Sequence, residues 1–549
     1  MATEQTEQQQ AKAVFLVKRY DRLDDAFRLW APLIKELADY IVPRRGAIIV
    51  TKQHTPGRRL TEKLFDSTAP HACDMLAASL AGTLTSASDR WFSLKMREGE
   101  LNDILEISDW LYQVSERIYL ALNQSNFNSE SHELYVDLAA FGTGDLYLQE
   151  SDIKHPGFNG FQFAAAPIGS FYISEDDYGQ VNTVARRVEM PVSAMAKKWG
   201  LENLSEQAQA AHGKDMDQML VLIHMVMPRE QDDKTSVMNR MPWCSYYVEY
   251  ERKWILSKGY FHEFPHMVPR WTKAAGEVYG RSPGNIALPD IKTLNKAVEL
   301  KLGALAKALN PPLMQKDDGV IGRVSSAPAA LNTVRDMDAI KPMMDGARFD
   351  VAEIEEDKLR QAIRTIFFSD QLQLQTGPQM TATEVEVRFE LMQRLLGPTM
   401  GRLESEFLNP LIDRCFALMM RAGALPPVPP VLAQLVRAGK ADMDVSYEGP
   451  LARAQRGGAL MSIQRAYAIL GSIAQAQPEV MDVPDPTKIS RFVLKNAGVP
   501  DQLSRSQNDI NTLREGRAKD AMVASQQQQQ MVQGEMASKI APLVKGAQQ

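Results

Sequence analysis

The segment HEFPH, from His262 to His266, is the part of the sequence that comes nearest to a catalytic motif. It fits H-E-x-x-H, in which two histidines one helical turn apart bind zinc and the glutamate activates a water molecule. The motif requires a helix, but Pro265 lies inside it and the surrounding residues GYFHEFPHMVPRW are aromatic and interrupted by proline. Such a composition is typical of a strand and a loop. We therefore expect structural histidines here and keep a zinc hydrolase only as an alternative.

Other reactive side chains lack the spacing that catalysis requires. Cys73 follows His71 by two residues in an Ala-rich segment, where a helix would direct the two side chains to different sides. The three cysteines form no CxxC pair, and no GxxxxGK[ST], GxGxxG or GxSxG sequence occurs. The acidic group from Glu353 to Asp357 is explained by the solvated start of a helix. We expect no enzymatic activity, no bound metal and no cofactor.

Length and charge limit the remaining functions. A chain of 549 residues allows about three or four modules, so a single small fold is excluded. The net charge of -6 lacks the basic excess of proteins that grip nucleic acid along their whole surface, so any contact with DNA must be local or weak. The start of the chain has no signal-peptide pattern, and its longest apolar stretch, Met219 to Met227, is too short to cross a membrane. We expect a soluble intracellular protein with no membrane insertion.

The first 280 or so residues have the pattern of a mixed α+β domain. Apolar residues spaced by three and four predict a helix through 23–41, ended by Pro43, and further helices are expected near 102–124 and 130–141. From Gly142 onwards, short β-rich runs broken by Gly, Pro and Asp predict an antiparallel sheet. Its strands resume at 217–227 and 243–270 after a helical interval. The aromatic pair in RWFSLK, 90–95, is expected to be buried.

The second half of the chain is predominantly helical. A helix over 285–310 has a single apolar stripe with lysines on the opposite face, and a second helix is predicted over about 351–368. The loop 369–382 is uncharged apart from Asp370. A long helix follows over 383–422, which Pro398 and Pro410 should kink because each deletes a backbone hydrogen bond. The remainder, 423–549, is expected to be helical with a mobile Gln-rich end.

Several local sequences occur between these elements in a characteristic order. They are RWFSLK at 90–95, YGRSPG and LPDIKTLN within 279–295, NPPL at 310–313, MTATEV at 380–385, GPTMGRLESEFLNPLI at 397–412 and GPLARAQR at 449–456. Together with the order of the elements, they resemble the portal, or head-to-tail connector, proteins of tailed bacteriophages, in the branch found in short-tailed phages. The resemblance covers nearly the whole chain.

The resemblance implies an α+β, predominantly helical portal fold that assembles into a closed ring, a homododecamer. The implied parts are a wing at 1–284, a first stem helix at 285–310, a clip at 311–350, a second stem helix at 351–368, a channel loop at 369–382, a long kinked wing helix at 383–422 and a crown at 423–549. Paired stem helices suit the head-to-tail interfaces that a closed ring requires.

The function implied by the resemblance is the passage of double-stranded DNA during packaging and ejection at one capsid vertex. The implied partners are the terminase large subunit, tail adaptor and tail tube proteins, and the major capsid and scaffolding proteins with which the ring nucleates the shell. The implied location is the virion, with the host cytoplasm during assembly. Another non-enzymatic virion assembly protein, such as a tail adaptor or scaffold, stays open as an alternative.

The implied channel leads to two groups of candidate contact residues. The uncharged loop offers hydrogen bonds without fixed charge, from Gln371, Gln373, Gln375, Thr376 and Gln379. Sparse cations are candidates for contacts with DNA or the motor: Lys292, Lys296, Lys316 and Arg323. At -6 per chain, a twelve-membered ring would carry roughly -72, a field that would repel phosphate and favour sliding over capture.

Overall fold

The computed structural model describes most of the first 309 residues and selected segments beyond them. The described residues are 2–46, 61–88, 90–151, 157–229, 241–309, 313–315, 340–342, 349–369, 397–437, 443–447, 463–474 and short pieces between 477 and 522. They belong to two compact units. The first comprises Met1–Phe92, Val114–Pro426 and Gly449–Leu451, and the second comprises Ser93–Gln113, Pro427–Glu448 and Ala452–Gln549.

The first unit begins with helices α1 (Ala2–Arg28) and α2 (Ala31–Tyr40), followed by a 3-10 turn at Pro43–Arg45. The prediction of one continuous helix through 23–41 is therefore wrong, because Pro32 in the first turn of α2 separates the two helices. Three more helices precede the sheets: α4 (Thr68–Leu84), α5 (Leu105–Gln124), whose residues up to Gln113 belong to the second unit, and α6 (Phe127–Phe141). The last two confirm the predicted helices near 102–124 and 130–141.

Two antiparallel sheets follow, as the alternating β-rich runs predicted. The smaller sheet has the order β3-β2-β9, with β2 at Asp145–Glu150, β3 at Phe161–Ala166 and β9 at His266–Met267. The larger has the order β4-β5-β6-β7-β8, at Phe171–Glu175, Val181–Pro191, Met219–Pro228, Trp243–Glu249 and Trp254–Phe261. Helices α7 (Val192–Trp199) and α8 (Glu206–Lys214) form the helical interval before β6.

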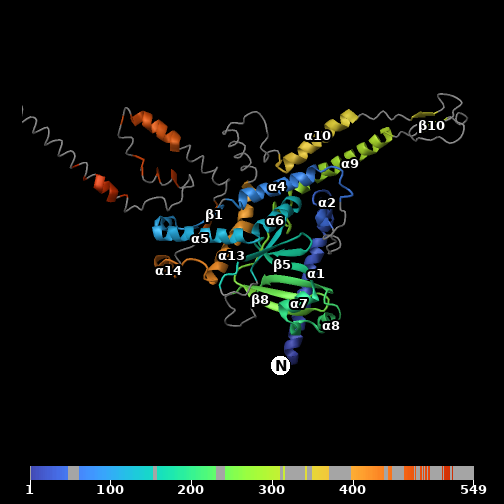
Figure 1. Cartoon of the computed structure of the whole chain (residues 1–549), viewed down its shortest axis with the longest axis horizontal. Coiled ribbons are helices and arrows are strands. Elements are labelled where there is room, and N and C mark those ends of the chain that lie inside the picture. Colours follow the sequence, from blue (N-terminus) through green and yellow to red (C-terminus); the bar gives the residue numbers. More distant parts are fainter. Residues whose placement is uncertain are drawn as a thin grey trace, which may run out of the picture. The chain divides into compact units, whose positions relative to one another are not determined.

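Two long helices form the next part of the unit and lie side by side (Figure 1). Helix α9 spans Pro283–Leu309 and helix α10 spans Phe349–Ile366, which confirms the helices predicted over 285–310 and 351–368. Between them, only strands β10 (Leu313–Gln315) and β11 (Ile340–Pro342) are described, and they pair antiparallel. Among the described helices, none has the length and apolar composition needed to span a bilayer.

The described part of the predicted long helix runs from 397 to Arg421. It contains one π-helical turn, Glu404–Leu408, and continues as α13, Asn409–Arg421. The turn ends two residues before Pro410, which has no N–H group for an α-helical hydrogen bond. The predicted irregularity at Pro410 is thus a π-helical turn, while residues 383–396 lie outside the described part of the chain.

The second unit joins residues that are far apart in the sequence. Strand β1 (Phe92–Met96) pairs with β12 (Met443–Tyr447), and Lys95 Nζ donates a hydrogen bond to Ser446 Oγ at 2.7 Å. No sequence pattern predicted this pairing. Helix α14 (Pro430–Arg437) and a helix at 463–474 also belong to this unit. Trp91 and Phe92, the aromatic pair of RWFSLK, belong to the first unit. Both side chains are buried, as predicted.

Candidate functional site

A buried ion-pair network joins the helices α9 and α10. Glu356 of α10 accepts hydrogen bonds from Lys301 of α9 at 3.2 Å and from Arg360, one turn further along α10, at 3.4 Å. Arg360 also donates to Asp66, the residue two positions before α4, at 3.0 Å. Because the end of α9 meets the start of α10, the two helices are antiparallel, and the network fixes them to each other and to the segment that leads into α4.

Glu356 corrects the expectation that the acidic group 353–357 is a solvated helix start. Glu353, Glu355 and Asp357 are exposed, but Glu356 is buried. Its charge is compensated by Lys301 and Arg360, as burial of a carboxylate requires. Sequence spacing does not reveal this burial, because the helix that Glu356 contacts, α9, is distant in the sequence.

Asn295 forms a second connection between α9 and the segment before α4. Its Oδ1 atom accepts hydrogen bonds from the backbone N–H groups of Phe65, at 2.8 Å, and Asp66, at 3.1 Å. Its Nδ2 atom donates to the Ile291 carbonyl at 2.9 Å, and the side chain is buried. Burial by itself raises the pKa of Asp66, but hydrogen bonds from Thr68 and Arg360 outweigh it and leave that pKa lowered. Asp66 therefore stays charged in the network.

The predicted cations of α9 are exposed, and each faces a carboxylate. Lys292 Nζ lies 3.2 Å from Glu36 Oε2 of helix α2, and Lys296 Nζ lies 2.9 Å from Glu299 Oε2. Exposed pairs of this kind contribute little to stability and exchange readily with other anions. Lys316 and Arg323 lie outside the described residues, as do Gln371, Gln373, Gln375, Thr376 and Gln379. The structure therefore brings none of these loop residues together with the lysines.

Helix α9 has two apolar faces, whereas the sequence pattern predicted a single one. The first contains Ile291 and Leu294, which are buried, and Leu302 and Leu305, which are 50% and 45% exposed. At 100° per residue, a second group falls within an arc of about 60°, roughly 130° away from the first. This second stripe consists of Ile286, Thr293, Ala297, Leu300 and Ala304. None of its members is buried, and Ile286 and Leu300 are 70% and 62% exposed.

The HEFPH segment is not helical, as its proline predicted. His262 follows strand β8 in a bend, while His266 belongs to strand β9, so the two histidines are not on one helical face. His266 is buried, and its Nδ1 atom lies 2.8 Å from Asp145 Oδ1. Among the described residues, no group of three or more His, Cys, Asp or Glu side chains is arranged to hold a metal ion. The segment therefore lacks the geometry of a helical zinc motif.

A second buried histidine lies close to His266. The two rings are 5.9 Å apart, and His224 of β6 shares a hydrogen bond of 3.0 Å with Ser245 of β7. Burial, together with the nearby positive charges of Arg186 and Lys198, holds the pKa of His224 well below its usual value. Burial also lowers the pKa of His266, although Asp145 opposes this shift. Both histidines belong to the core that joins the two sheets.

Cys73 is a buried thiol of α4, as expected, and His71 is exposed on another side of the helix. Burial raises the pKa of the Cys73 thiol, which disfavours the reactive thiolate. Cys244 and Cys415 are also buried and free.

Arg270 is the centre of a charged cluster that connects the sheets to the helix over 397–421. The Arg270 cluster consists of Arg270, Glu175, Lys273 and Glu406. Arg270 Nη2 lies 2.7 Å from Glu406 Oε1, Nη1 contacts Glu175, and Lys273 Nζ lies 2.7 Å from Glu175 Oε2. Burial alone lowers the pKa of Arg270, but the carboxylates of Glu406 and Glu175 outweigh it and the pKa is raised.

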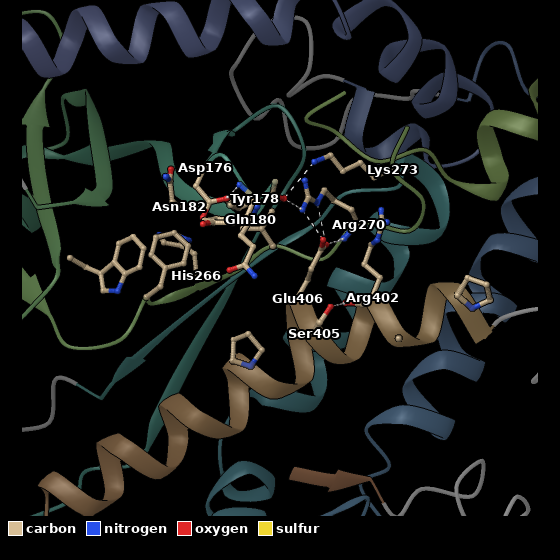
Figure 2. Close-up of a pocket in the computed structure, with 18 residues that line it drawn as sticks. Asp176, Tyr178, Gln180, Asn182, His266, Arg270, Lys273, Arg402, Ser405 and Glu406 are labelled. Atoms are coloured by element: carbon tan, nitrogen blue, oxygen red, sulfur yellow. Dashed lines mark hydrogen bonds and ion pairs between the residues drawn. The ribbon is translucent and has the colours of Figure 1, made fainter. Parts of the chain in front are cut away.

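A pocket of about 800 Å³ lies beside this cluster (Figure 2). One wall is the turn between β4 and β5, which includes Asp176 and Gln180, and the opposite wall is the helix over 397–421 with Arg402, Ser405 and Glu406. Both walls belong to the first unit.

The sequence as a whole matches one protein family. The pattern of the family described as bacteriophage head to tail connecting protein extends over residues 15–504, which includes both sheets, the helices α9 and α10 and the helix over 397–421. The chain belongs to this family.

Two relatives align with almost the whole length of this chain. It is 31% identical to the probable portal protein of Bordetella phage BPP-1 over 543 residues, which is 96% of this chain and 94% of the relative. It is 29% identical to the portal protein of Salmonella phage epsilon15, over 92% of this chain and 90% of the relative. A chain in the virion of a native gene transfer agent particle is 12% identical over 84% of this chain and 99% of its own length, with a TM-score of 0.39, too low to establish a shared fold.

Sequence patterns did not identify the residues that connect the helices and sheets of this chain to one another. Arg270 and Glu406 are 136 positions apart, and Lys301 and Glu356 are 55 apart. One signal was available: Glu406 lies within GPTMGRLESEFLNPLI, one of the local sequences that carry the resemblance. Asn295 likewise ends LPDIKTLN, another of these local sequences. Arg270 had no such signal, because a single Arg between Pro269 and Trp271 does not reveal its partner.

Proposed function

We propose that this chain is the subunit of a closed homododecameric ring, the portal, through which double-stranded DNA enters and leaves the capsid at one vertex. The observation that carries this proposal is the family match over residues 15–504, with two relatives named as portal proteins that align over at least 90% of their own length. Family membership of this extent supports a common role for the whole chain. The subunit would then be a non-enzymatic component of the virion that assembles in the host cytoplasm.

Within this ring, we assign residues 1–284 to the wing, 285–310 and 351–368 to the stem and 311–350 to the clip. Residues 369–382 would form the channel loop, 383–422 the long wing helix and 423–549 the crown. The clip would dock the terminase large subunit, and later the tail adaptor and tail tube proteins. Contacts with scaffolding and major capsid proteins would allow the ring to nucleate the shell.

The faces of α9 support the assignment of a stem. A helix with a single neighbour needs one apolar stripe, but α9 has a second stripe, from Ile286 to Ala304, that no described residue buries. A helix that packs between two neighbouring helices in a ring needs two apolar stripes. The lysines Lys292, Lys296 and Lys307 project between the two stripes, at about 240°, 280° and 300° when Ile286 defines zero.

The charges of this third face suit a path along which DNA moves. Lys292 and Lys296 are each paired with a carboxylate, so a passing phosphate would have to compete with Glu36 or Glu299. This competition reduces the counterion release that makes a dense row of free lysines bind DNA tightly. We assign further transient contacts to Lys316, Arg323 and the channel-loop residues Gln371, Gln373, Gln375, Thr376 and Gln379.

Packaging tests the proposal directly. Capsids assembled with the full-length chain should package double-stranded DNA when the terminase and ATP are supplied, while capsids assembled without the chain should not. Equal packaging in both preparations would contradict the proposed function. A role as tail adaptor predicts a different result, because such a protein would be needed only after the DNA is inside.

A further inference from the structure

The spacing of apolar residues along the helix over 397–421 favours a π-helical turn at Glu404–Leu408. Leu403, Phe407, Leu411 and Cys415 are all buried and are spaced by four. In a regular α-helix of 3.6 residues per turn, each such step would rotate the side chain by about 40° away from the core. The wider π-helical turn removes part of this rotation. The sequence therefore favours a π-helical turn here. Pro410 and the apolar spacing do not by themselves determine the direction of residues 397–403 relative to α13.

Arg270 fixes this turn through three hydrogen bonds to one carboxylate. Glu406 Oε1 accepts from Arg270 Nη2 at 2.7 Å, and Oε2 accepts from Nε at 3.1 Å and from the Arg270 backbone N–H at 2.9 Å. Arg270 is 1% exposed. Bidentate pairs of this kind define an orientation as well as a distance.

The other contacts of Arg270 fix it to the sheets independently of the helix. Its guanidinium contacts Glu175 at the end of β4 and donates to the carbonyl groups of Gly179, at 2.9 Å, and Val278, at 3.2 Å. Lys273 provides Glu175 with a second cation. Arg270 thus has contacts to the sheets that do not depend on Glu406, and Glu406 binds to the guanidinium that these contacts orient.

Close packing does not hold the helix on the side that faces the pocket. Pro398, Gly401, Arg402 and Ser405 line this pocket, and a Cβ atom at Gly401 would meet no neighbour within 4 Å. The buried Nη1 atom of Arg402 has no hydrogen-bond partner among the described residues. Among the described residues on this side, the Arg270–Glu406 pair is the contact that fixes the orientation of the helix relative to the sheets (Figure 2).

We propose that Arg270 is a positioning residue that acts through Glu406 to select the π-helical turn at 404–408. By doing so it sets the direction of residues 397–403, the described part of the helix that lies nearest in sequence to the assigned channel loop. Conversion of the turn to a regular α-helix would rotate 397–403 by about 100°, one residue's rotation, relative to α13. The consequence for DNA passage rests on the proposed function, whereas the effect on the turn does not.

Amide hydrogen exchange of the assembled full-length protein tests the effect on the turn. Glu406→Gln keeps the shape of the side chain but removes its charge, and should accelerate exchange at 404–409 by about tenfold or more. Arg421→Gln is the matched control, because Arg421 of α13 forms an exposed pair with Glu263, at 2.5 and 2.7 Å, beyond the turn. It should leave exchange at 404–409 unchanged. Unchanged exchange in Glu406→Gln, or equal acceleration in both variants, would overturn the proposal.

The double variant Arg270→Gln/Glu406→Gln separates positioning from stability. It leaves the Glu175–Lys273 pair and no unpaired buried charge, so its thermal midpoint should exceed that of Arg270→Gln alone, while exchange at 404–409 should stay fast. Slow exchange in the double variant would overturn the positioning role.

Packaged particles report on the functional consequence. We expect Glu406→Gln particles to contain rings but less retained DNA than wild-type or Arg421→Gln particles. Normal DNA content together with fast exchange would refute the functional consequence of the turn. Absence of rings in the wild-type protein would refute the proposed function, and the exchange comparison would still decide the role of Arg270.

Discussion

The second apolar stripe of α9 makes a strong prediction about assembly, which Leu300→Asp tests. Leu300 is 62% exposed in the single chain. Complete burial of a leucine side chain contributes about 1.5–3 kcal/mol, so covering the exposed part in a ring would contribute roughly 1–2 kcal/mol at each interface. An aspartate would lose this contribution and would also bury an unpaired carboxylate. We expect each interface to weaken by about 2–3 kcal/mol, roughly 30- to 140-fold in its dissociation constant.

Sedimentation velocity over a range of protein concentrations measures this effect. Leu300→Asp should remain folded by circular dichroism but should require a much higher concentration to form rings. Leu29→Asp makes the same chemical change at a position that is 85% exposed, between α1 and α2, and should assemble like the wild type. The reasoning would be refuted if Leu300→Asp formed rings at the wild-type concentration.

Three further predictions concern the loop, the buried histidines and the anchor of α9. Deletion of 371–379 should spare ring formation, seen by native mass measurement, but impair DNA packaging or retention; unchanged packaging would remove the loop from the mechanism. Because His224 and His266 have lowered pKa values in the folded chain, the unfolded chain binds more protons. Acidification through the unfolded-state pKa of about 6.5 should therefore destabilise the fold, by up to about 1.4 kcal/mol per pH unit for each histidine. The thermal midpoint should fall between pH 7.5 and 5.5, and less steeply in His224→Asn; equal slopes would contradict this origin. Asn295→Ala leaves two backbone N–H groups without their acceptor and should cost about 2–4 kcal/mol in the free energy of unfolding, whereas Asn295→Asp keeps the acceptor and should cost less. Equal losses in a denaturation series would argue against the acceptor's role.

Local sequence patterns predicted the elements whose stability depends on one amphipathic face. The stripe Ile291, Leu294 and Val298 located α9, and the alternation around Gly142 located the antiparallel strands. The proline in HEFPH predicted the absence of a helix there. In each of these cases, the determining interactions lie within a few residues of one another.

Features that depend on distant partners could not be predicted in this way. The residues next to Glu356 in the sequence, Glu355 and Asp357, indicate a solvated turn, whereas its burial depends on Lys301 of another helix as well as on Arg360. The pairing of β1 with β12 joins segments about 350 residues apart. The second stripe of α9 was overlooked because Thr293 and two alanines interrupt it, so it has few large apolar residues. Small side chains at an interface give a weak hydropathy signal even when they permit close approach.

We propose that this chain forms a closed ring. Negative-stain imaging of the purified full-length protein, combined with native mass measurement, tests it most directly. We predict ring-shaped particles with a central channel and a mass of twelve subunits of 61.4 kDa each. A purely monomeric protein under assembly conditions, or open filaments of no fixed subunit number, would contradict it.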